Sequence, residues 1–88
     1  MEIKMFYKTQ RELADVINKL LDAYWNSDIK EEFLINQISN LYINNPSKIM
    51  KNSDFTTIIQ QQCGKRRLEV VQRILNIDQN RKKDDYGQ

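Results

Sequence analysis

The sequence has no histidine, one cysteine, and glycines only at positions 64 and 87. Without histidine the chain cannot build a Ser-His or Cys-His nucleophile pair or an imidazole metal site. One cysteine without histidine cannot hold a structural zinc ion, and two separated glycines cannot form a phosphate-binding loop. We therefore expect a protein that is not an enzyme, with no catalytic residues, no cofactor and no metal.

Long apolar segments are also missing. No apolar run approaches the roughly 18 residues that span a bilayer, and no signal peptide opens the chain. A single cysteine cannot form an internal disulfide, which fits a reducing compartment. The chain is rich in Ile, Asn and Lys and has two alanines, a usage typical of an AT-rich genome. We expect a cytoplasmic bacterial protein without membrane contact.

The composition is that of one small globular domain, with 88 residues, 40% hydrophobic and 30% charged. The net charge of +2 is unevenly distributed. Residues 1–64 have seven basic and eight acidic side chains, whereas residues 65–88 have seven and four. The basic surplus therefore lies at the C-terminal end, and it is modest for a nucleic-acid-binding protein.

The first helix is predicted over residues 9–25. Thr9 and Glu12 have the T-x-x-E spacing of a capping box, and Asn26 and Ser27 end the pattern. The apolar side chains between them recur every three or four residues and form one stripe. The stripe consists of Leu13, Val16, Ile17, Leu20, Leu21 and Tyr24.

A second helix is predicted over residues 28–44. Asp28 is its expected N-cap with Glu31 at the third position, and Pro46 stops it. The connection between the two helices is short, which favours an antiparallel helical hairpin. The apolar stripe of this second helix consists of Ile29, Phe33, Leu34, Ile38, Leu41 and Tyr42.

Residues 2–8 form an N-terminal arm in which Ile3, Met5 and Tyr7 alternate at a period of two. This is a strand-like pattern, but the chain has no second convincing strand to pair with it. The arm either packs as an extended strap over the helices, starts the first helix early, or pairs with another chain. We favour the strap.

Gly64 separates two further helices. At 100° per residue, the apolar side chains before it and after it lie about half a turn apart on a single helix. A straight helix would therefore be apolar on opposite sides. A glycine in the left-handed αL conformation lets the chain turn, so we predict helices over 54–63 and 66–77.

The predicted fold is all-α: a helical hairpin plus two shorter helices, with the extended N-terminal arm. Residues 1–77 form the single domain, and residues 78–88 are expected to be a disordered polar tail. The expected core consists of Leu13, Ile17, Leu20, Phe33, Ile38, Leu41, Phe55, Ile59, Leu68, Val71 and Leu75.

The basic triplet Lys65-Arg66-Arg67 has two interpretations. It either follows the third helix and suits its exposed carbonyls, or begins the fourth helix and offers its N-terminus to an anion. In the second case the contact residues for phosphate or nucleic acid are Lys65, Arg66, Arg67 and Arg73, with Lys82 and Lys83 as a trailing arm.

Residues 56–75 have the length of a helix-turn-helix with Gly64 in the turn. That pattern is weak, because Gln60, Lys65 and Arg73 fall on positions where other residue types are expected. Cys63 is either a small apolar packing residue or a thiol activated by the neighbouring cations. We favour packing.

Aromatic side chains are the other candidates for a contact surface. Trp25 and Tyr24 are adjacent at the end of the first helix, so both cannot share one face. Together with Tyr7 in the arm, Trp25 is a candidate interface residue.

The segment DFTTIIQQQCGKRRLEVV from Asp54 to Val71, with KTQREL from Lys8 to Leu13, resembles a small family of uncharacterised proteins from Gram-positive bacteria. The resemblance covers most of residues 1–77 and implies no activity, cofactor or site residue.

The sequence therefore predicts a non-catalytic binding or interaction protein, whose partner is another protein or a second copy of itself in a homodimer. The alternative is a nucleic-acid-binding regulator that uses the basic segment 65–73.

Overall fold

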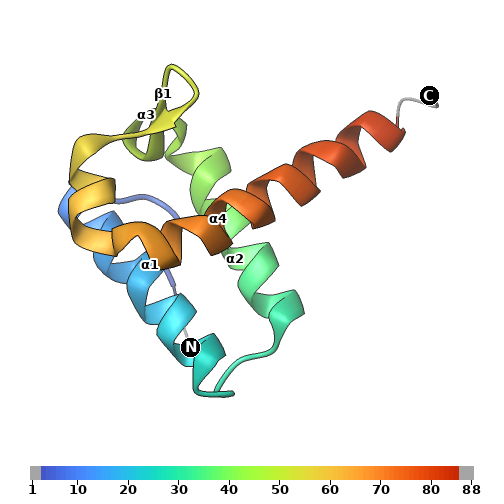
Figure 1. The fold of residues 1–88 in the computed structure, drawn as a ribbon, viewed down its shortest axis with the longest axis horizontal. Coiled ribbons are helices and arrows are strands. Elements are labelled where there is room, and N and C mark those ends of the chain that lie inside the picture. The colour runs from blue at the N-terminus through green and yellow to red at the C-terminus, as the bar shows by residue number, and fades with distance from the viewer. Residues whose placement is uncertain (1–2, 86–88) are drawn as a thin grey trace.

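The computed structural model describes the backbone of residues 3–85 and the side chains of residues 3–76. In this part of the chain the order of elements is α1 (Gln10–Trp25), α2 (Glu31–Asn44), α3 (Pro46–Ile49), β1 (Met50–Lys51), β2 (Asp54–Phe55) and α4 (Thr57–Asp85). The predicted all-α class is confirmed, with one short β-hairpin added. Figure 1 shows α1 and α2 as a hairpin that α4 crosses, with the C-terminal half of α4 running beyond them.

The start of α1 is the predicted one. The Thr9 side chain accepts a hydrogen bond of 3.1 Å from the Glu12 N–H, and the Thr9 hydroxyl donates to Glu12 Oε1 at 3.1 Å. The T-x-x-E pair therefore caps the helix, with its second bond between the two side chains.

The end of α1 explains why α2 starts later than predicted. Ser27 has a φ of 64°. Its N–H bonds to the Tyr24 carbonyl at 3.0 Å, and the Asp28 N–H bonds to the Ala23 carbonyl at 2.8 Å. This is a Schellman motif, and it holds Asp28 at the end of α1. The prediction of Asp28 as the N-cap of α2 was wrong: α2 begins at Glu31, and its N-cap Lys30 makes no side-chain capping bond.

The hairpin of β1 and β2 replaces the predicted start of the third helix. Asn52 and Ser53 have φ values of 54° and 67°, and Lys51 pairs with Asp54 on either side of them. Two central residues with positive φ make the two-residue turn that matches strand twist. The helix predicted from residue 54 therefore begins at Thr57.

The predicted break at Gly64 is confirmed, but its conformation is different. Gly64 has φ 82° and ψ 164°, which is not αL but a region that only glycine readily adopts. It divides α4 into a first segment (57–63) and a second segment (65–85). The second segment is helical to Asp85, well past the predicted end at residue 77. Residues 86–88 of the expected tail lie outside the described residues, and the division into domain and tail stays a prediction.

The core lies between the hairpin and α4, which packs chiefly on α1 and then on α2. Most residues of the predicted core are buried; Phe33 and Phe55 are half-buried and pack against it. Burial of apolar side chains contributes about 25 cal/mol per Å² removed from water, so this shared interface is the main source of stability.

The N-terminal arm is a strap, as favoured from the sequence, and Asn45 holds it. The Asn45 side chain is 4% exposed. Its Oδ1 accepts from the Tyr7 N–H at 3.3 Å, and its Nδ2 donates to the carbonyls of Met5 at 2.6 Å and Leu41 at 2.9 Å. These bonds replace the strand pairing that the arm lacks.

Candidate binding groove along helix α4

Three residues of α1 bond to residues on either side of the break at Gly64. Ala14, Asn18 and Asp22 are spaced four residues apart, so they lie on one face of α1; we call them the α1 stripe. Asn18 Nδ2 donates to the Gln62 carbonyl at 2.9 Å, and the Cys63 thiol lies 3.8 Å from the Ala14 carbonyl. A helix end leaves carbonyls without intrahelical partners, and Asn18 supplies a donor to one of them, the Gln62 carbonyl.

Arg67 completes this arrangement from the second segment of α4. Its Nε and Nη2 donate to Asp22 Oδ1 at 3.2 and 2.9 Å, and Nη2 also lies 3.1 Å from Asp22 Oδ2. Its Nη1 donates to the Cys63 carbonyl at 3.3 Å. Arg67 therefore satisfies the end of the first segment while joining α4 to α1.

Arg66 is positioned by an aromatic ring. Its guanidinium lies 4.6 Å from the centroid of Trp25, a cation–π distance. Trp25 is 37% exposed, whereas Tyr24 is half-buried against the core. The expectation that only one of these two aromatics packs inward is confirmed.

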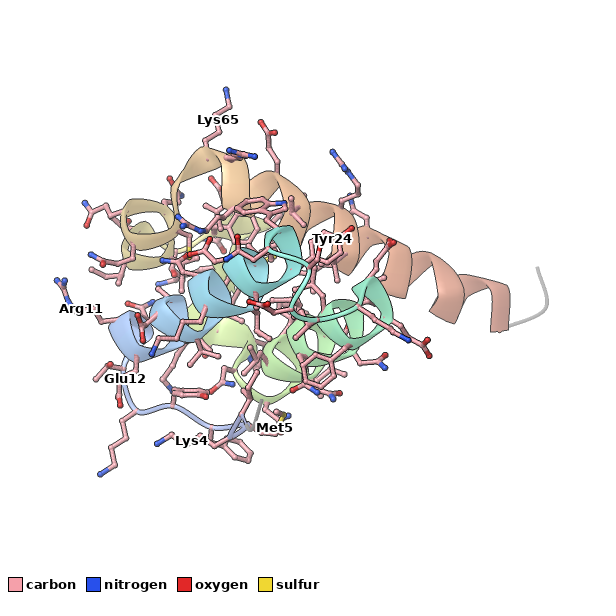
Figure 2. The ribbon with its side chains drawn as sticks, turned by 90° about the horizontal axis from the view of Figure 1, so that it is seen from below. Lys4, Met5, Arg11, Glu12, Tyr24 and Lys65 are labelled. Carbon is pink, nitrogen blue, oxygen red and sulfur yellow. The ribbon has the colours of Figure 1, made fainter. Side chains whose placement is uncertain are left out.

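Lys65 and Arg73 line an open groove, the α4 groove. Its residues come from β2, from the first segment of α4 and from one face of the second segment. They are Asp54, Phe55, Gln60, Lys65, Leu68, Glu69, Gln72, Arg73 and Asn76. Leu68 is buried and Phe55 half-buried, and charged side chains surround them. Figure 2 shows Lys65 extending away from the helices.

The charges of the groove alternate along the helix. Lys65, Glu69 and Arg73 follow one another at four-residue spacing, so they lie on the same face, with Lys65 and Arg73 about 12 Å apart along the axis. In the part of the chain whose side chains are described, the ion pairs are Lys19–Asp15 and Arg67–Asp22. The groove charges are thus available to a partner.

Cys63 is a packing residue. Its side chain is 3% exposed. Burial raises the pKa of the thiol to about 11, against a smaller opposite effect of the Arg67 charge. A thiol with a raised pKa is protonated at neutral pH, so the interpretation as an activated thiol was wrong.

The structure separates the predicted anion-contact residues. Arg67 is bound to Asp22, Arg66 lies on Trp25, and only Lys65 and Arg73 line one groove. The break at Gly64 is a single residue, whereas a helix-turn-helix has a turn of three or four residues. The helix-turn-helix interpretation is therefore wrong. The side chains of Lys82 and Lys83 lie outside those described.

Of the two predicted interface aromatics, Trp25 is at the surface and Tyr7 is not. Tyr7 is 7% exposed, and burial, with a smaller effect of the Glu12 charge, raises its pKa. Tyr7 packs in the core of its own chain, with Ile3 against the same cluster, whereas Phe6 is 70% exposed. The role of Tyr7 at an interface stays a prediction.

The described residues contain no group of three His, Cys, Asp or Glu side chains that could hold a metal ion. Among the described helices, none has both the length and the apolar character needed to cross a membrane.

Comparison with known proteins places the chain in a family. The profile of a family described as "Conserved hypothetical protein" matches residues 4–76, which include the α1 stripe, Gly64 and the α4 groove. The chain belongs to this family. No curated protein and no solved structure matches it. The family match agrees with the resemblance to uncharacterised proteins and adds no activity to it.

Proposed function

We propose that this chain is a non-catalytic binding protein that holds another polypeptide in the α4 groove. The observation that carries the proposal is the groove itself, which is lined by the buried Leu68, the half-buried Phe55 and charged side chains. Apolar centres with polar rims are the usual anatomy of protein–protein contacts.

The shape and charges of the groove favour a polypeptide over a small anion. Along α4 the groove runs from Lys65 to Asn76, about 17 Å of helix, which suits a helix lying alongside. The carboxylates of Asp54 and Glu69 lie in the same groove as Lys65 and Arg73. Mixed signs of charge fit a peptide that carries both signs and would repel part of a polyanion.

The cellular setting is part of the same proposal: the cytoplasm of a Gram-positive bacterium. Cys63 is a free, buried cysteine, which fits a compartment that keeps cysteines reduced. The Ile-, Asn- and Lys-rich composition supports a bacterial source with an AT-rich genome.

A second candidate is a nucleic-acid-binding regulator that uses the exposed Lys65, Arg66 and Arg73. The observation in its favour is that Lys65 and Arg66 are exposed where the second segment of α4 begins. Binding through three phosphate contacts would give a slope of about −2.7 for log K against log salt concentration on duplex DNA. The groove proposal predicts no such complex with the purified protein.

Site-specific photo-crosslinking tests the groove. A photoreactive amino acid at Asn76, which is exposed and lines the groove, is compared in cells with the same residue at Asn40. Asn40 is an exposed asparagine of α2 outside the groove, so it controls for random collisions. We expect a discrete protein adduct from position 76 that is absent from position 40. Equal labelling at both positions, or crosslinking of position 76 to nucleic acid, would contradict the proposal.

A further inference from the structure

We propose that the polypeptide in the α4 groove is the α4 helix of a second copy of this chain, lying antiparallel. This inference rests on the proposed function and names its partner. It is carried by the order of charges on α4, by the length of that helix beyond the hairpin, and by the shape of the groove.

The charges complement those of a second copy when the two helices are offset by four residues, and an antiparallel pair makes this offset compatible with a two-fold axis. Lys65, Glu69 and Arg73 read plus, minus, plus at four-residue spacing. A parallel pair in register would place like charges opposite each other. In an antiparallel pair whose two-fold axis is level with residue 71, Glu69 of each copy faces Arg73 of the other. A two-fold interface repeats every contact, so this arrangement makes two ion pairs between the copies.

The length of α4 fits the same arrangement. Figure 1 shows the second segment of α4 running past the hairpin of α1 and α2. A projecting helix gains little stability without tertiary packing. With the axis level with residue 71, residue 77 of one copy lies level with residue 65 of the other, and residues 78–85 continue past the break at Gly64. That is where Phe55, Gln60 and Lys65 line the groove, so the backbone of each projecting helix end lies along a packing surface.

The charge pairing makes the dimer testable by charge reversal. Glu69→Arg or Arg73→Glu alone places two like-charge contacts in the dimer, and the double variant restores opposite charges. We expect each single variant to weaken dimerisation at least about tenfold and the double variant to recover it to within about threefold of the parent chain. Arg11→Glu, an exposed arginine of α1 outside the groove, is the matched control and should leave dimerisation unchanged.

Sedimentation equilibrium of the full chain from about 5 to about 500 µM measures the dissociation constant of the dimer for the parent chain and each variant. Circular dichroism shows whether each variant is folded. A monomer at every concentration overturns the inference. A double variant that dimerises as weakly as the single variants also overturns it. So does a control variant whose dimerisation is weakened as much as theirs.

The two proposals fail in different ways. A monomeric chain whose position 76 crosslinks to a different protein leaves the proposed function standing and removes the second copy as its partner. A monomeric chain that forms no specific adduct at position 76 removes both. A dimer that is indifferent to both single charge reversals shows that the copies associate through another surface, and this also overturns the inference.

Discussion

Asp22 and Arg67 lie 45 residues apart in the chain and are joined by three short contacts, the shortest 2.9 Å. The pair fixes the break of α4 against the end of α1. The Arg67 guanidinium is therefore not available to bind an anion, because it donates hydrogen bonds to Asp22 and to the Cys63 carbonyl. The two faces of α4 therefore have separate roles: one holds the fold together, and the other lines the groove.

The first prediction concerns the energy of this pair. A double-mutant cycle of Asp22→Ala and Arg67→Ala should give a coupling of about 1 kcal/mol in the free energy of unfolding, because the contact is forked and partly buried. The Asp15–Lys19 pair of α1 is the control, since it is more exposed and lies within one helix. Its coupling should be about 0.3 kcal/mol. Equal couplings in urea unfolding would contradict the role given to Arg67.

The second prediction concerns the backbone at Gly64. Gly64→Ala should lower the free energy of unfolding by about 1–3 kcal/mol, because alanine is strained at this φ and ψ. A Cβ at this position meets no atom within 4 Å, so the cost is not steric crowding by neighbours.

The Gly64→Asn variant tests whether residue 64 has the observed backbone conformation or the αL conformation. Asparagine tolerates αL better than alanine does, but it has no advantage in the region that Gly64 occupies. The two variants should therefore have similar urea midpoints. An asparagine variant close to the parent chain would show that the break is an αL turn.

Local signals predicted much of this fold and little of how its parts are held together. The Thr9–Glu12 cap and the Gly64 break depend on residues close in sequence, and both were predicted. The contacts of Asn18 and Asp22 were not predicted, because their partners lie more than forty residues away in the chain. The type of a polar residue on a helix does not indicate which element it contacts. The four-residue spacing of Asn18 and Asp22 was the available signal, and it is shared by many exposed pairs.

The missed hairpin has a different physical reason. Asn52 and Ser53 both adopt positive φ, but only Asn favours it, so the usual Asn-Gly signal of such a turn is absent. The late start of the third helix follows from this turn. The groove could not be predicted either, because it forms only where β2 and the two segments of α4 come together.

The third prediction concerns the N-terminal strap. Asn45→Ala removes the hydrogen bonds to Tyr7 and Met5, so the arm should open more often and the amide hydrogen of Tyr7 should exchange faster. The free energy of unfolding should fall by about 1–3 kcal/mol, because polar groups of the arm are left unpaired.

Asn44→Ala is the matched control for the strap. Within the part of the chain whose side chains are described, the Asn44 side chain bonds within α2, to the Asn40 carbonyl at 2.8 Å. This variant should leave exchange at Tyr7 unchanged. Faster exchange at Tyr7 in both variants would show that Asn45 does not hold the arm.

The fourth prediction concerns pH. The pKa of the buried Cys63 thiol is raised from 9.0 to about 11 in the folded chain. The unfolded chain therefore loses this proton first as the pH rises. The stability that the protonated thiol contributes is fully present below pH 9 and is lost as the pH rises through about 11. The loss should amount to about 1–3 kcal/mol.

A comparison with Cys63→Ala isolates this effect, because Tyr7 and the lysines also titrate at alkaline pH. The difference in unfolding free energy between the parent chain and this variant should be constant below pH 9 and shrink above it. A difference that stays constant to pH 11 would contradict the burial of the thiol.

Pairing of two copies through the α4 groove is the central claim, and the amide chemical shifts of the isotope-labelled chain at increasing protein concentration test it most directly. We expect concentration-dependent shifts at Phe55, Lys65, Glu69 and Arg73, with the α1 stripe unchanged. Shifts confined to the surface around Trp25 and Arg66, or no shifts at any concentration, would contradict it.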